Sequence, residues 1–141
     1  MTLTAAPATD SLFAGWSGGV CSGTGTCLTT MNAAKTVTAT FTQYLTVTVP
    51  NGSEPWSRGS TYTIRWNYAG NPGSNVKIEL LKGGALNRTI SSSTSIGGSG
   101  SGSYSWKVPS NQTVGSDYTI RVTSTSNSNY KDASNANFTI Q

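Results

Sequence analysis

The sequence predicts an all-β protein, in which a seven-stranded antiparallel sandwich follows a small disulfide-stapled β unit. Three observations indicate this fold class. Of the 141 residues, 43 are Ser or Thr and 16 are Gly, so the residues that favour helices are scarce. The apolar residues lean towards Val, Ile, Tyr and Trp, which favour strands. Apolar and polar residues also alternate with a period of two, as they do in half-buried strands.

Residues 1–43 are expected to form the small unit. Three short stretches alternate small or apolar residues with Thr and predict strands at 2–5, 27–31 and 36–41. Cys21 and Cys27 stand in a Gly/Ser/Thr loop after the aromatic pair Phe13 and Trp16. Their spacing suits a disulfide across a hairpin loop, although two unrelated buried thiols also fit the sequence. A bond that closes so small a loop would stabilise the unit by roughly 2 kcal/mol.

Residues 44–141 alternate more regularly and contain turn signals between the alternating stretches. Seven strands are expected there, at 45–49, 60–68, 75–84, 87–93, 103–109, 117–124 and 137–141. The fourth of them, NRTISSS, is short and polar and is expected at a sheet edge. Seven strands in a segment of this length are typical of an immunoglobulin-like or fibronectin-III-like sandwich.

The alternation also assigns a face to each side chain of the sandwich. The predicted core is Val47, Ile64, Trp66, Ile78, Leu80, Tyr104, Trp106, Ile120, Val122 and Phe138. Glu79 and Leu81 are expected to face outward beside Lys77. Tyr118 opens a strand just after a glycine turn, which is the placement of a tyrosine corner whose hydroxyl bonds to backbone near Val114. A buried tyrosine without that bond fits the sequence equally well.

The titratable residues argue against catalysis. The chain has no His and only five Asp or Glu residues, which excludes His-based triads and His metal sites. Glu79 and Asp117 are the best available carboxylate pair for glycoside hydrolysis, but neither has a neighbour that would raise its pKa. The oxygens around Asp132 include one carboxylate, too few for calcium. We therefore expect no enzyme, no catalytic residue, no cofactor and no metal.

The net charge of +4 lies in the second segment. Residues 1–43 hold Lys35 against Asp10, whereas residues 44–141 hold eight Lys or Arg residues against four acids. These cations are scattered singly, without the clusters that follow a phosphate backbone. No run of eighteen apolar residues occurs either. The sequence therefore predicts neither nucleic-acid binding nor membrane insertion.

Sugar binding would require an outward-facing aromatic residue, because flat sugar faces stack on exposed rings. Trp56 is the candidate, since PWSRG lies in a predicted turn, and Arg58 and Tyr62 are close in sequence. Tyr130 in the SNSNYKD loop is a weaker second candidate. Alternatively, Trp56 closes one end of the sandwich. The glycine tract GGSGSG is expected to be a flexible hairpin loop, because the strand-loop-helix plan of a phosphate site is missing.

The stretch FAGWSGGVCSGTGTCLTTMNAAKTVTATF resembles the C-terminal half of the divergent internalin B-repeat-like modules of long bacterial surface and secreted proteins. The shared pattern is an aromatic residue near GWSG, the Cys pair, TM and VTATF. These modules usually carry further strands before TLTA. The resemblance therefore implies a partial B-repeat-like module at 1–43.

Residues 44–141 resemble the sandwich domain of the Ser-Thr-rich glycosyl-phosphatidylinositol-anchored membrane family. That domain is shared by yeast cell-wall glucan-assembly proteins and many exported bacterial and archaeal proteins. The matching stretches recur in order: LTVTVPNGSEPWSRGSTYTIRW, NVKIELLKGG, GSYSWKVP and DYTIRVTSTSNSNYKDASNANFTI. The resemblance implies an accessory module of a surface or secreted protein, with no catalytic residues.

The favoured function is a non-catalytic structural or adhesion spacer in an exported multi-domain protein, located at the cell surface or outside the cell. The disulfide and the resemblance both indicate an oxidising compartment. The alternative is a carbohydrate-binding accessory module of a secreted polysaccharide-active enzyme. The expected partners are the neighbouring domains of the parent protein and, under the alternative, cell-wall or extracellular polysaccharide.

Overall fold

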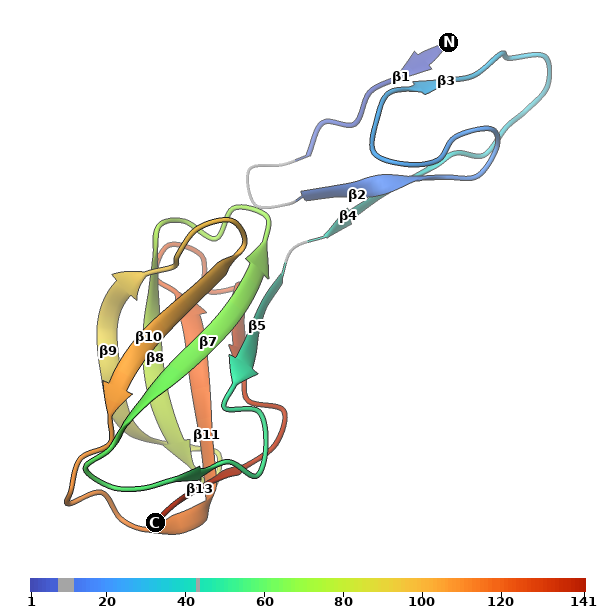
Figure 1. Ribbon diagram of the computed structural model, residues 1–141. Helices are drawn as coiled ribbons and strands as arrows, with labels where there is room; N and C mark the ends of the chain where they lie inside the picture. The colour runs from blue at the N-terminus through green and yellow to red at the C-terminus, as the bar shows by residue number, and fades with distance from the viewer. Residues whose placement is uncertain (8–11, 43) are drawn as a thin grey trace. The chain divides into compact units, whose positions relative to one another are not determined.

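The computed structural model describes residues 1–7, 12–42 and 44–141, and every regular element in these ranges is a strand. The chain divides into two compact units (Figure 1). One comprises Met1–Gln43 with Ala69–Asn71, and the other comprises Tyr44–Tyr68 with Pro72–Gln141. Within the described ranges, no helix has the length and apolar character needed to cross a membrane.

The first unit contains two antiparallel strand pairs. β1 (Thr2–Leu3) pairs with β3 (Cys27–Leu28), and β2 (Leu12–Ser17) pairs with β4 (Thr38–Thr42). The three stretches predicted here contain β1, β3 and β4, whereas β2 was not expected. Its register slips between Phe13 and Gly15, and Gly15 has a φ of 143°. Such a bulge interrupts the period of two by which strands are recognised.

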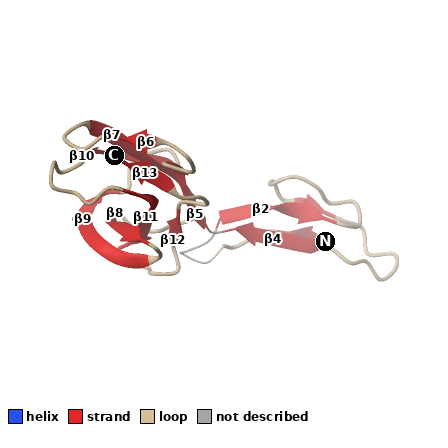
Figure 2. Cartoon of the chain, turned by 90° about the horizontal axis from the view of Figure 1, so that it is seen from below, coloured by secondary structure: helices blue, strands red, loops and turns tan. Residues whose placement is uncertain are grey.

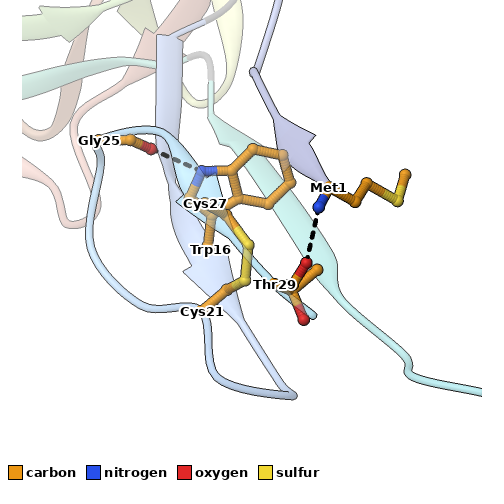
Figure 3. The surroundings of a disulfide bond; sticks show 6 residues. All are labelled: Met1, Trp16, Cys21, Gly25, Cys27 and Thr29. Atoms are coloured by element: carbon orange, nitrogen blue, oxygen red, sulfur yellow. Dashed lines mark hydrogen bonds between the residues drawn. A yellow bond between two sulfur atoms is a disulfide. The ribbon is translucent and has the colours of Figure 1, made fainter. Parts of the chain in front are cut away.

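Cys21 and Cys27 are joined in a disulfide with a Cα–Cα distance of 5.4 Å, which lies in the usual range. The predicted pairing is therefore confirmed, and both residues are buried. Trp16 lies beside the bond in Figure 3, and its Nε1 donates a hydrogen bond of 2.7 Å to Gly25 O. The disulfide and this hydrogen bond both fix the loop between the two cysteines.

Aromatic contacts supply much of the packing in the first unit. Phe13 contacts Trp16 with ring centroids 5.1 Å apart and Phe41 with centroids 5.5 Å apart. Phe41 is nevertheless 42% exposed, so the apolar area that this unit buries is small. A unit this small depends on additional links such as a disulfide.

The second unit is a two-layered sandwich (Figures 1 and 2). One sheet has the order β10 (Ser101–Lys107), β7 (Thr61–Ala69), β5 (Tyr44–Val49). The other has the order β6 (Pro55–Trp56), β13 (Phe138–Ile140), β11 (Gly115–Ser124), β8 (Asn75–Lys82), β9 (Ala85–Ser95), and β12 (Lys131–Ala133) also pairs with β11. The predicted fold class is confirmed.

All seven strands predicted for this segment are present, and β9 lies at a sheet edge as expected. β6 and β12 are additional. They contain two and three residues, too few to show an alternation in the sequence. β6 pairs with β13 in parallel, which draws a segment predicted to be a turn into the sheet.

Nine of the ten predicted core residues are buried, with Ile64, Trp66 and Phe138 fully inaccessible. Tyr104 is the exception, because it is only partly buried against the core. The reason is its position on β10, the edge strand of the three-stranded sheet. The core extends beyond the prediction to Trp56 and Tyr130.

The outward assignment of Glu79 and Leu81 is wrong, because both residues are buried. They lie on β8, which is flanked by β9 and β11. The long side chains of Lys77 and Arg121 reach over Glu79 and bind its carboxylate at 2.8 Å each. Neighbouring side chains therefore cover β8 on both of its faces.

Tyr118 forms a tyrosine corner, which was one of its two expected placements. Its hydroxyl donates a hydrogen bond of 2.6 Å to Thr113 O, next to the predicted Val114. Gln112 Nε2 donates to the same hydroxyl at 3.1 Å and to Asn87 Oδ1 at 2.8 Å. The corner therefore ties the loop before β11 to both the core and β9.

We expect Trp66→Ala to lower the free energy of unfolding of the sandwich by about 3–5 kcal/mol, because it removes a fully buried indole from the core. Urea denaturation would measure the loss. Leu86→Ala is the matched control, since Leu86 is 57% exposed and should change stability by less than about 0.5 kcal/mol. An equal effect of the two substitutions would contradict the assignment of the core.

The double substitution Cys21→Ser and Cys27→Ser should weaken the first unit by about 2 kcal/mol, through the lost loop constraint. Hydrogen exchange would show it as faster exchange of the Trp16 amide, which bonds to Gly23 O. The Val108 amide of the sandwich, which bonds to Ser60 O, is the internal control and should keep its rate. Unchanged exchange at Trp16 would show that the disulfide is not what holds this unit.

Candidate functional site

Trp56 is buried, with 3% of its surface exposed. Its ring stacks on Tyr62 with centroids 4.8 Å apart and an interplanar angle of 3°, and it contacts Phe138 at 4.7 Å. Trp56 thus closes one end of the sandwich, which was the second of its two expected placements. No face of its ring is open for a sugar to stack on.

Arg58 and Tyr62 lie in the same corner as Trp56, as their closeness in sequence suggested. The Ser57 amide donates a hydrogen bond of 2.7 Å to the Tyr62 hydroxyl, and this bond lowers the pKa of Tyr62. Arg58 is exposed, and its amide donates to Gln141 O at 2.8 Å. Arg58 and Trp56 both bond to the backbone of Gln141, whereas the aromatic pair packs against the core.

Tyr130 lies away from this corner and is 1% exposed. Its carbonyl accepts a hydrogen bond of 2.8 Å from the Ser124 amide, at the last residue of β11. Trp56 is instead next to Ile140, which pairs with Gly115 at the first residue of β11. The two aromatic residues therefore lie at opposite ends of β11 and do not form one site.

The two carboxylates considered for catalysis are held by cations. Lys77 and Arg121 bind Glu79, and Lys82 binds Asp117. Burial alone would raise the pKa of Glu79, but the hydrogen bonds from Lys77 and Arg121 outweigh it and lower that pKa. The hydrogen bond from Lys82 lowers the pKa of Asp117. A general acid needs a raised pKa, so neither carboxyl group has the electrostatics of one.

The described residues form a polar cleft of about 410 Å³ in the sandwich. It lies on the outer face of the three-stranded sheet and extends to β9 and the β9–β10 connection. Its lining consists of Thr48, Arg65, Trp66, Asn67, Thr94, Ser95, Gly97, Gly98, Ser101, Gly102 and Ser103. Small-molecule sites occupy about 300–1,000 Å³, so the cleft has the volume of a ligand site.

Strand register places the polar side chains of the cleft together. Ser103 pairs with Arg65 and Ser101 pairs with Asn67 across β10 and β7. Directly paired residues project from the same side of a sheet. The four side chains therefore line one outer face, where an arginine and an amide on β7 lie opposite two hydroxyls on β10.

The wall of the cleft is fixed by close packing of the glycine tract. A Cβ on Gly97 would lie 2.0 Å from Ser101 O, and one on Gly102 would lie 2.5 Å from the Trp66 indole. Gly98 and Ser101 exchange backbone hydrogen bonds of 3.0 and 3.1 Å. The tract is therefore a specific turn, in which the missing side chains let the backbone approach Trp66.

Sequence analysis did not identify this cleft. The sequence does contain two features of the cleft. Arg65 and Asn67 occupy outward positions in one predicted strand, and the glycine tract precedes the predicted strand that pairs with it. What brings them together is the pairing of β10 with β7, which the sequence does not reveal. Within the described ranges, no three His, Cys, Asp or Glu residues gather where they could hold a metal.

Comparison with known proteins gives one family match. The family model of the Kre9/KNH-like N-terminal Ig-like domain matches residues 49–140. A search of curated proteins finds no match. Among solved structures, the titin domains Z1Z2 in complex with telethonin align with a TM-score of 0.38 and 19% identity, covering 69% of this chain and 47% of that one. A chimeric titin Z1Z2–Z1Z2 tandem aligns with a TM-score of 0.39 and 20% identity, covering 79% and 60%.

We expect Glu79→Gln to lower the free energy of unfolding by about 1.5–3 kcal/mol at pH 7, because it replaces charge-assisted hydrogen bonds to a buried group. The folded-state pKa of Glu79 lies below its ordinary value. Its ionised form therefore stabilises the fold above about pH 5, and this contribution is lost as the pH falls through the folded pKa.

Urea melts from pH 7 down to pH 3 would test this dependence. The difference between the wild type and Glu79→Gln should shrink as the solution becomes acidic. Asp117→Asn is the control and should have a smaller effect, because Asp117 and its partner Lys82 are partly exposed. A difference that stays constant with pH would mean that the charge of Glu79 does not stabilise the fold.

Proposed function

Because the chain belongs to the family of Kre9/KNH-like N-terminal Ig-like domains, we propose that it is a non-catalytic spacer module of a longer exported protein. Domains of this kind are typically structural, and the Glu79 and Asp117 carboxyl groups have lowered pKa values instead of the raised pKa of an acid catalyst. In this proposal the sandwich separates neighbouring domains and resists extension. The partners are those domains.

The observation that carries the proposal is the position of the strand ends in the sandwich. The loop after β5 meets the start of β13, where the Ser53 amide donates to Asn137 O at 2.9 Å. β5 therefore begins at one end of the sandwich and β13 finishes at the other, as Figure 1 shows. A module whose first and last strands lead to opposite ends adds its length to the chain it belongs to.

β5 is also held from both sides, as a strand under tension must be. On one side it pairs with β7. On the other, Asp132 on β12 accepts a hydrogen bond of 2.8 Å from the Val47 amide. The carboxylate occupies a backbone donor that would otherwise be open at a sheet edge. This contact links β5 to the opposite sheet.

An extracellular or cell-surface location fits the disulfide, since such bonds persist in oxidising compartments. It also fits the cell-wall association of the family. Residues 1–43 precede the family match, and we propose that they belong to a second, B-repeat-like β module. An adhesive role would come from partners bound along the length of the parent protein.

The alternative of a carbohydrate-binding module that stacks neutral sugars loses its main support. That function required Trp56 or Tyr130 to offer a ring face, and both residues are buried. We therefore expect no retention of the chain on insoluble cellulose, chitin or β-glucan.

Single-molecule pulling on the ends of the sandwich would test the spacer function. We expect one discrete unfolding event with a length gain of roughly 300 Å, set by about 3.3–3.6 Å per extended residue. Asp132→Ala should lower the unfolding force, because it removes the clamp on β5 and forced unfolding follows the unfolding rate. Asp117→Ala is the matched control and should leave the force unchanged, since Asp117 binds Lys82 and not β5. Extension in several weak steps would refute the spacer function.

A further inference from the structure

Arg65 in the polar cleft differs from the three cations on the opposite sheet that bind acids. Lys77 and Arg121 bind Glu79, and Lys82 binds Asp117. Among the described residues, none forms an ion pair or a side-chain hydrogen bond with Arg65, which is exposed. Its guanidinium therefore keeps its full hydrogen-bonding capacity for a ligand.

The distribution of acids leaves this charge uncompensated. The strands β5, β7 and β10 carry the cations Arg65 and Lys107 and no Asp or Glu. Among the acids that the structure describes, the two outside the ion pairs already accept backbone hydrogen bonds elsewhere. Glu54 accepts from Asn51 and Gly52 at 2.9 and 2.8 Å, and Asp132 accepts from Val47 at 2.8 Å. The cleft therefore selects for negative charge in its ligand.

We propose that the cleft binds a uronic acid residue of an acidic polysaccharide, with the sugar carboxylate on Arg65 and its hydroxyls on the Ser, Thr and Asn side chains that surround it. A guanidinium matches a carboxylate with two parallel hydrogen bonds, which are stronger than bonds between neutral groups. Hydroxyl side chains both donate and accept, as the hydroxyls of a sugar ring do. The lining and the ligand are thus chemically complementary.

The composition of the cleft also excludes other ligands. Trp66 is fully buried, so the cleft has no aromatic face on which a neutral sugar could stack. Nucleic acid binding needs several cations along the phosphate backbone, whereas Arg65 is the one cation among the lining residues. The preferred ligand therefore has many hydroxyls and one negative charge on each unit.

The cleft is shaped before any ligand arrives, which lowers the ordering cost of binding. Trp66 Nε1 donates to Ile96 O at 2.9 Å, and the Tyr68 amide donates to Gly100 O at 2.8 Å. Together with the close packing of Gly97 and Gly102, these bonds hold the wall formed by the β9–β10 connection against the sheet that carries Arg65.

Calorimetric titration of the full chain with tetragalacturonic acid tests the proposal. We expect binding that weakens as salt is added, because exposed charges are screened. Arg65→Ala should weaken it at least tenfold, a change of about 1.4 kcal/mol. Arg65→Lys keeps the charge without the paired geometry, so its affinity should lie between those of Arg65→Ala and the wild type. Lys107→Ala is the matched control, at the far end of β10 and outside the cleft, and should bind like the wild type.

Titrations with other ligands distinguish recognition of the carboxylate from other modes of binding. The methyl ester of tetragalacturonic acid, which has lost its charge, and neutral cello-oligosaccharides should not bind. Equal binding of the ester, or an equal loss in Lys107→Ala and Arg65→Ala, would overturn the assignment of the carboxylate to Arg65. Binding of a sulfated oligosaccharide or of single-stranded DNA in place of the uronate, or no binding, would overturn the proposal. Thermal melts of each variant would confirm folding, and the pulling experiment decides the spacer function independently.

Discussion

The hydrogen bond from Trp66 Nε1 to Ile96 O is the contact on which both the closure of the sandwich and the shape of its cleft depend. Trp66 lies on β7 in one sheet, and Ile96 directly follows β9 in the other. A buried indole N–H without a partner would cost about 1–3 kcal/mol, so the β9–β10 connection must stay against the ring. Gly102 permits this approach because it has no side chain. One contact therefore completes the core and fixes the wall of the cleft.

The two sheets use their charges differently. On the six-stranded sheet, Lys77, Lys82 and Arg121 bind Glu79 and Asp117, and these pairs cover the outer face of β8. On the three-stranded sheet, the outer face carries small hydroxyls with Arg65 and Lys107 and no acid. These paired charges stabilise the fold, whereas Arg65 on the other sheet remains open to a ligand. The chain keeps a structural face and a recognition face on one small sandwich.

The strands and most of the core follow from the sequence, because alternation of the kind seen at Ile64 and Trp66 is a local property. Tyr118 could be placed at a corner for the same reason. Glu79 could not be assigned correctly, since its burial depends on Arg121 from a neighbouring strand, 42 residues away. Trp56 was ambiguous because two residues of β6 give no pattern. The cleft needs the register of β10 against β7, and no local signal contains that register.

The abundance of Ser and Thr also accounts for how open the cleft is. Only 10% of the residues are charged, whereas protein surfaces are commonly rich in Lys, Arg, Asp and Glu. Hydroxyl side chains keep the surface polar with one or two heavy atoms beyond the Cβ. The side chains on the outer sheet face therefore project only a short way into the solvent. A Lys or Glu at Ser101 or Ser103 would extend a flexible stem over the cleft, and an acid there would neutralise Arg65. The composition that specifies strands thus also leaves one arginine accessible, among neighbours too short to cover it.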